Sequence, residues 1–193
     1  PNMIIISLGL LAIGKIGQEL NLYNHLPGVG LRPRWAFNFY DMYKLIHSIA
    51  ERSHATAVKR GQDVSTFGCI AALRTEQQEY WQAVDKGAEV ADIRVLSAEA
   101  NKLPDAEFTA LYEAKIHNTA SDELADILIT AATWLHTAET GGGEDFDPDR
   151  SIDAMLLSGA VQFVCNRITG NADVERVQLV TNLKLRFNEL REG

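Results

Sequence analysis

The sequence predicts an all-α protein, an antiparallel bundle of about five or six helices. Apolar residues recur at spacings of three and four along several segments, which is the pattern of one helix face. No comparable stretch alternates with the period of two that a half-buried strand shows. Glycine and proline concentrate at 25–33, 86–104 and 140–150, and such clusters separate helices from one another.

The chain length suits a single domain. Its 193 residues are enough to bury one substantial core, and the 46% hydrophobic and 23% charged residues are ordinary for a globular protein. We predict an N-terminal arm or extra helix over residues 1–35 and one all-helical domain over 36–193. The predicted helices cover residues 36–60, 66–86, 105–117, 119–138, 151–168 and 172–192.

Apolar stripes and one cap locate these helices. Met42, Ile46 and Ile49 share a face of the first predicted helix, and the same periodicity continues in the segments that follow. The segment 86–104 mixes glycine and polar residues with scattered hydrophobic ones and is predicted as a connection. Thr119 is a suitable N-cap for the fourth helix, whose first turn is acidic.

Charge and cysteine usage exclude several classes of protein. The formal net charge of −8, from 26 acidic and 18 basic residues, would repel a nucleic-acid polymer, while a mononucleotide remains a possible ligand. Cys69 and Cys165 lie in apolar stretches outside any Cys-x-x-Cys pair, which predicts reduced thiols and a cytoplasmic location. The apolar run at 3–13 is about half a membrane span and lacks the features of a secretory signal, so no membrane partner is expected.

Two acidic pairs are the main functional signal. Glu76 and Glu79 lie three residues apart on the second predicted helix, about 60° apart in projection, and Glu123 and Asp126 repeat this spacing on the fourth. Each pair borders an apolar stripe, whereas a single Glu-x-x-Glu is usually a solvated face. Four converging carboxylates need a counter-charge, and oxygen-only ligands favour Mg²⁺, with Mn²⁺ as a substitute.

The last predicted helix carries a polar face near its end. Lys184, Asn188 and Arg191 stand at positions i, i+4 and i+7 and continue an apolar stripe. Two cations and an amide on one face suit a phosphate or a nucleotide. The alternative is that cations gather near a helix C-terminus because of the helix dipole.

These segments together resemble the MazG-like branch of the all-α nucleoside triphosphate pyrophosphohydrolases. ALRTEQQEYWQAVDKG is similar to the family's first metal helix, HNTASDELADILI to its second, and KLRFNELR to its Lys-x-x-x-Asn-x-x-Arg segment. The likeness covers roughly residues 40–138 and 180–191. The chain departs from the family at Thr75, in the 43 residues between Glu79 and Glu123, and in an apparent inserted helix within 141–173.

The resemblance implies a reaction. A nucleoside triphosphate would be cleaved to the monophosphate and pyrophosphate, with magnesium held by Glu76, Glu79, Glu123 and Asp126, one of the glutamates acting as general base. Lys184, Asn188 and Arg191 would bind the substrate. Short helices with broad apolar faces favour a homodimer or homotetramer.

Two other functions remain open. One is a non-catalytic helical oligomerisation or interaction module. The other is a carboxylate di-iron bundle protein, suggested by Glu51-x-x-His54, although such bundles need two of these motifs and the sequence has one. Trp81 and Trp134 suit either core packing or stacking on a nucleobase.

Overall fold

The computed structural model describes residues 34–140, 152–167 and 171–191. The arm or extra helix expected at 1–35 therefore lies almost entirely outside the described residues. The described part contains helices and no strand, which confirms the all-α prediction. Its helices are α2 (Arg34–Lys59), α3 (Thr66–Asp85), α4 (Ile93–Ala100), α5 (Asp105–Lys115), α6 (Ala120–Thr140), α7 (Ile152–Cys165) and α8 (Asn171–Leu190).

Helix α4 lies within residues 86–104, which the sequence predicted only as a connection between helices. The side chain of Asp92 accepts hydrogen bonds from the backbone N–H groups of Arg94 and Val95, which caps the first turn. Ile93 and Ala100 are buried on one side of this helix. With eight residues, α4 is too short for its periodicity to stand out in the sequence.

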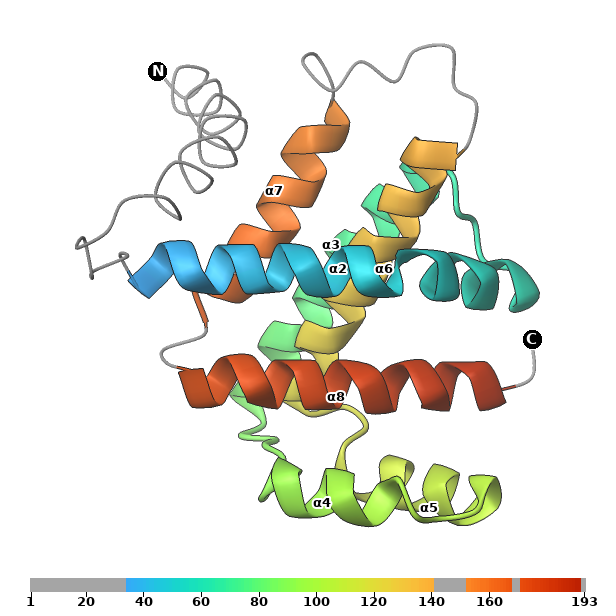
Figure 1. Cartoon of the computed structure of the whole chain (residues 1–193), viewed down its shortest axis with the longest axis vertical. Coiled ribbons are helices and arrows are strands. Elements are labelled where there is room, and N and C mark those ends of the chain that lie inside the picture. Colours follow the sequence, from blue (N-terminus) through green and yellow to red (C-terminus); the bar gives the residue numbers. More distant parts are fainter. Residues whose placement is uncertain (1–33, 141–151, 168–170, 192–193) are drawn as a thin grey trace, which may run out of the picture.

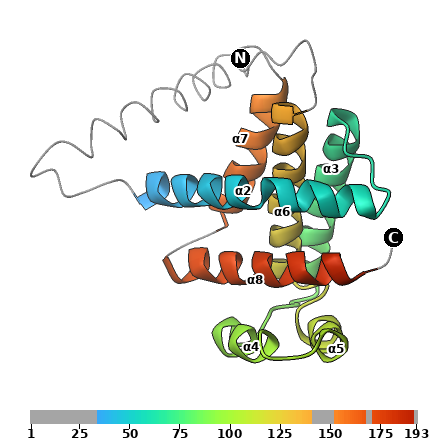
Figure 2. The ribbon, with the colours of Figure 1, turned by 45° about the vertical axis from the view of Figure 1, so that its right-hand side comes forward.

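The helices form two crossed layers (Figure 1). Helices α3, α6 and α7 run in alternating directions, as an antiparallel bundle requires, and α2 and α8 lie across them. Turning the molecule keeps α2 and α8 on the same side of α6 (Figure 2). Helices α4 and α5 pack against the side of α8 that faces away from α2.

Two hydrophobic clusters stabilise this arrangement. The larger joins α2, α3, α6, α7 and α8, and the smaller joins α4 and α5 to α8. Helix α6 contributes to both and is buried over most of its length, including the wholly enclosed Ile127 and Leu128. Because a helix buried on nearly all sides is normally apolar, any charged residue on α6 requires an explanation.

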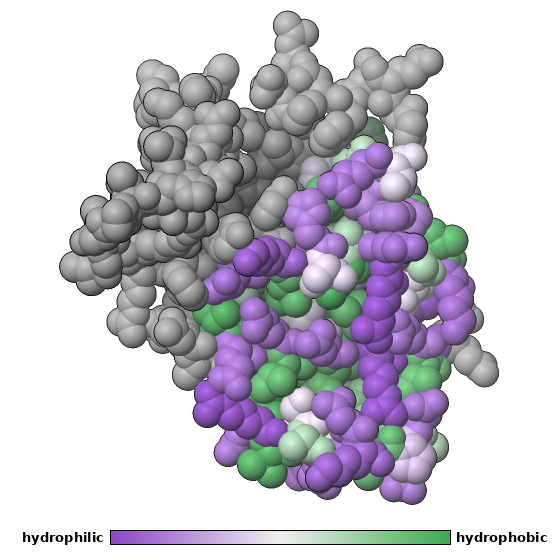
Figure 3. Space-filling view, viewed as in Figure 1, coloured by the Kyte–Doolittle hydropathy of each residue, from purple (hydrophilic) through white to green (hydrophobic). Residues whose placement is uncertain are grey.

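The outer surface is mixed in character. On the side seen in Figure 3, hydrophilic and hydrophobic residues alternate over the described surface. None of the helices described is long and apolar enough to cross a membrane.

Candidate metal centre

The acidic start of α6 lies inside the protein. Thr119 Oγ1 accepts a hydrogen bond from the Asp122 backbone N–H at 3.2 Å, which confirms the predicted cap. The side chains that follow are enclosed: Asp122 is 0% exposed and Glu123 is 4% exposed. The same turn that begins the helix therefore carries two carboxylates into the core.

Three carboxylates from two helices converge. Glu76 of α3 and Glu123 and Asp126 of α6 can each offer one oxygen, and these oxygens lie within 4.8 Å of one another. Glu79, the fourth acid of the predicted set, is exposed and lines the same pocket but is not part of this close group. The group contains no histidine or cysteine, and such an oxygen-only donor set fits a hard divalent cation such as Mg²⁺ or Mn²⁺.

Burial and mutual repulsion oppose ionisation in this group. Burial, together with the charges of Asp126, Glu79 and Glu123, raises the pKa of Glu76 to about 8. Burial and the neighbouring Asp126 raise the pKa of Glu123 to about 8. The pKa of Asp126 rises to about 6, again mainly through burial, although Lys184 opposes the shift. The carboxylates therefore lack sufficient positive charge around them.

Lys184 reaches this group from α8. Its Nζ lies 2.6 Å from Asp126 Oδ2 and 2.9 Å from Asp122 Oδ1, and its side chain is 5% exposed. Burial alone would lower the pKa of Lys184, but the two adjacent carboxylates raise it above its usual value. The ammonium is consequently held charged inside the protein, between one carboxylate of the close group and one outside it.

Asp122 is the more firmly held of the two carboxylates. Its Oδ1 accepts a hydrogen bond from the Tyr112 hydroxyl, and its Oδ2 accepts one from the Asn118 backbone N–H at 2.9 Å. Asn118 adopts a left-handed conformation with φ of 60°, which asparagine tolerates better than most residues. The Tyr112 ring stacks on Phe187 of α8, with ring centroids 4.4 Å apart.

Glu76, Glu79, Glu123 and Asp126 line a pocket of about 530 Å³. Helix α2 contributes Ser53 to its lining, Arg60 follows directly after α2, and α8 contributes Asn188. Ser53 Oγ and Asn188 Oδ1 are buried without a hydrogen-bond partner among the described residues. Burial and the nearby charge of Arg191 lower the pKa of Arg60, so two guanidinium groups lie close together in this region.

All seven residues selected from the sequence line this pocket, the four acids together with Lys184, Asn188 and Arg191. Arg60 and Ser53 are not among the residues predicted from the sequence, and Asp122 is predicted there only as part of the acidic first turn of its helix. Arg60 carried a weak signal, since it is a cation in the last turn of a predicted helix. Ser53 carried none.

The other candidate residues lie elsewhere. Trp134 is buried in the core and Trp81 is 50% exposed, and neither lines the pocket. His54 packs against His136 with ring centroids 4.6 Å apart, outside the carboxylate group. Glu51 is exposed on α2. The described residues therefore do not bring the Glu51-x-x-His54 pair to the acids, as a di-iron centre would require.

The pocket thus combines a carboxylate group that suits a divalent cation with a basic region that suits an anion. Comparison with protein-family models, with curated proteins and with solved structures finds no match to this chain.

Proposed function

We propose that the pocket is the active site of a cytoplasmic, magnesium-dependent nucleoside triphosphate pyrophosphohydrolase of the MazG-like type. The observation that carries the proposal is the convergence of Glu76, Glu123 and Asp126 in a pocket that also contains Arg60 and Arg191. A triphosphate chelated to a divalent cation presents both charges, and this pocket offers groups of the opposite sign for each. Both cysteines are free, which supports a reducing compartment.

Each residue has a distinct part in the proposed reaction. Glu76, Glu123 and Asp126 hold the cation, and Arg60 and Arg191 bind phosphate oxygens. A divalent cation supplies Lewis acidity and neutralises charge on the phosphate chain. Glu79 lines the pocket outside the close group, so it is the glutamate best placed to act as general base.

The proposed chemistry is a single hydrolysis. Glu79 takes a proton from a water molecule, whose oxygen forms a bond to the phosphorus of either the α or the β phosphate. The bond from that phosphorus to the oxygen that bridges the two phosphates breaks at the same time. The products are a nucleoside monophosphate and pyrophosphate. Asn188 and Ser53 line the pocket and have buried oxygens without a hydrogen-bond partner among the described residues, which supports a contact with hydrogen-bond donors of the substrate.

A panel of canonical and modified nucleoside triphosphates tests this function. Pyrophosphate release is measured with Mg²⁺, with Mn²⁺ and with excess chelator. We expect release from at least one substrate with either cation and none with chelator. Inactivity toward the whole panel would contradict the proposal and favour the non-catalytic oligomerisation or interaction module.

We also propose that the protein forms a homodimer or homotetramer. Phe67 is 84% exposed and Trp81 is 50% exposed, both on α3, and exposed aromatic residues of this size are typical of contact surfaces. Light scattering coupled to size-exclusion chromatography measures the mass directly. A monomer at all concentrations would contradict this assembly.

A further inference from the structure

We propose that Lys184 is a resident cation of the carboxylate pocket, which neutralises Asp126 in the absence of metal and is retained by Asp122 when a divalent cation binds. This inference rests on the proposed metal centre. It assigns Lys184 a role in metal exchange, in place of direct substrate binding, and it makes Asp122 and Tyr112 positioning residues.

The Lys184 ammonium group lies against one of the proposed metal ligands. Lys184 Nζ lies 2.6 Å from Asp126 Oδ2, so it uses an oxygen of a carboxylate that belongs to the close group. A divalent cation bound there would lie next to the ammonium and be repelled by it, strongly so because the surroundings are buried. Lys184 therefore lowers the affinity of the group for metal.

Asp122 is buried and held by hydrogen bonds. This carboxylate is fully enclosed, is outside the close group, and has hydrogen-bond donors at both oxygens, from Tyr112 and from Asn118. Fixed donors at both oxygens hold the carboxylate of Asp122 in place. Since Asp122 Oδ1 is 2.9 Å from Lys184 Nζ, it can keep the ammonium paired after Asp126 turns to a metal.

Lys184 is less available to bind a phosphate than the two arginines of the pocket. Its side chain is 5% exposed and already has two carboxylate partners, whereas Arg60 and Arg191 line the pocket and form no ion pair among the described residues. A phosphate would have to displace a buried, charge-assisted interaction to reach Lys184. The arginines are accessible without that loss.

The test is the dissociation constant for Mn²⁺, measured by electron paramagnetic resonance on the full chain. Lys184→Met removes the competing cation, and we expect it to tighten Mn²⁺ binding by at least about tenfold. Asp122→Asn leaves Lys184 with Asp126 alone, and we expect it to weaken binding severalfold. Lys102→Met removes an equal charge from the exposed turn after α4, outside the pocket, and should leave the constant unchanged.

Folding is controlled separately. Lys184→Met leaves Asp122 without its ion pair, so the double variant Lys184→Met/Asp122→Asn provides a form in which both charges are absent. Circular dichroism reports whether each variant is helical, and the double variant should also bind Mn²⁺ more tightly than the wild type. Unchanged Mn²⁺ affinity in the folded Lys184 variants would overturn the inference but not the metal centre. Absence of Mn²⁺ binding by the wild type would overturn both.

Discussion

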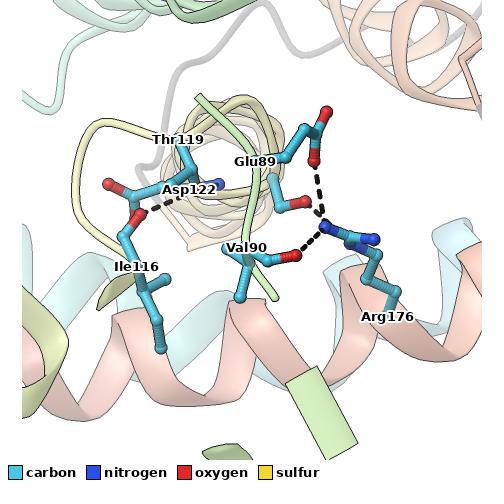
Figure 4. A network of polar contacts seen from close by, with 7 residues as sticks. Glu89, Val90, Ile116, Thr119, Asp122 and Arg176 are labelled. Carbon is cyan, nitrogen blue, oxygen red and sulfur yellow. Dashed lines mark hydrogen bonds and ion pairs between the residues drawn. The ribbon is translucent and has the colours of Figure 1, made fainter. Parts of the chain in front are cut away.

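Two cations of α8 contact the first turns of α6, and they do so in opposite electrostatic settings. Arg176 bonds to Ser121 Oγ at 3.0 Å, to the Val90 carbonyl at 2.7 Å and to the Glu89 carboxylate at 2.9 Å (Figure 4). Its single carboxylate partner matches its single charge. Lys184, two turns further along α8, pairs with two carboxylates that adjoin further acids.

The difference separates a contact whose charges are balanced from one that adjoins further acids. The Arg176 network ties the segment before α4 to α6 and α8, and its charges are balanced without any ligand. The Lys184 network adjoins Glu76 and Glu123, whose pKa values are raised to about 8, so ionising these acids inside the protein costs stability unless a further cation is bound. Charge imbalance, more than the mere presence of buried ion pairs, therefore marks the site.

The largest expected effect comes from Glu123→Gln. This nearly isosteric change removes one charge from the close group, so Mn²⁺ affinity and pyrophosphate release should both fall by about 100-fold or more. Release is measured with the best substrate of the panel. Glu113→Gln on the exposed face of α5 is the matched control and should behave as the wild type. Full activity of the Glu123 variant would show that the imbalance has no catalytic meaning.

The second prediction concerns pH and metal together. Because the pKa values of Glu76 and Glu123 are raised to about 8, the folded, metal-free protein binds protons more tightly than the unfolded chain. The stability contributed by these groups is present at low pH and is lost as the pH rises toward about 8. The midpoint of thermal unfolding without metal should therefore fall over this range.

Magnesium should reverse that trend. A cation at about 100 times its dissociation constant stabilises the folded state by about 2.7 kcal/mol, which corresponds to roughly 5–10 °C for a domain of this size. The increase should be largest near pH 8 and smaller near pH 5.5, where protons compete for the carboxylates. An equal increase at both pH values would contradict the assignment.

Arg176→Met tests the balanced network. It removes hydrogen bonds to Val90 and Ser121, and we expect the free energy of unfolding in urea to fall by about 1 to 2 kcal/mol. Mn²⁺ affinity should change less than about twofold, because the lost contacts do not involve the close group. A large loss of metal binding would erase the distinction between the two networks.

The smallest effect is expected for Trp81→Phe, outside both networks. Trp81 is half exposed, lies beside Arg167 and does not line the pocket. Stability should change by less than about 1 kcal/mol and kcat/KM by less than about twofold. A marked rise in KM would place the nucleobase against this tryptophan and would require a different substrate position.

Much of the fold follows from the sequence because apolar periodicity is a local property. Six predicted helices are present with small shifts at their ends, while α4 was missed because two turns hold too few repeats. The nearness of Glu76 to Asp126 was expected, since each pair borders an apolar stripe. The partners of Lys184 and the presence of Arg60 depend on how α8 and α2 cross α6, which no local pattern records.

The long segment between the two acidic pairs links α5 to the carboxylates of α6. Helix α5 carries Tyr112, whose ring packs in the smaller cluster while its hydroxyl bonds to Asp122. A contact or substitution that displaced α5 would withdraw that hydroxyl and loosen the carboxylate that retains Lys184. If Asp122 has the role proposed for it, displacement of α5 would therefore change the affinity of the pocket for a metal ion.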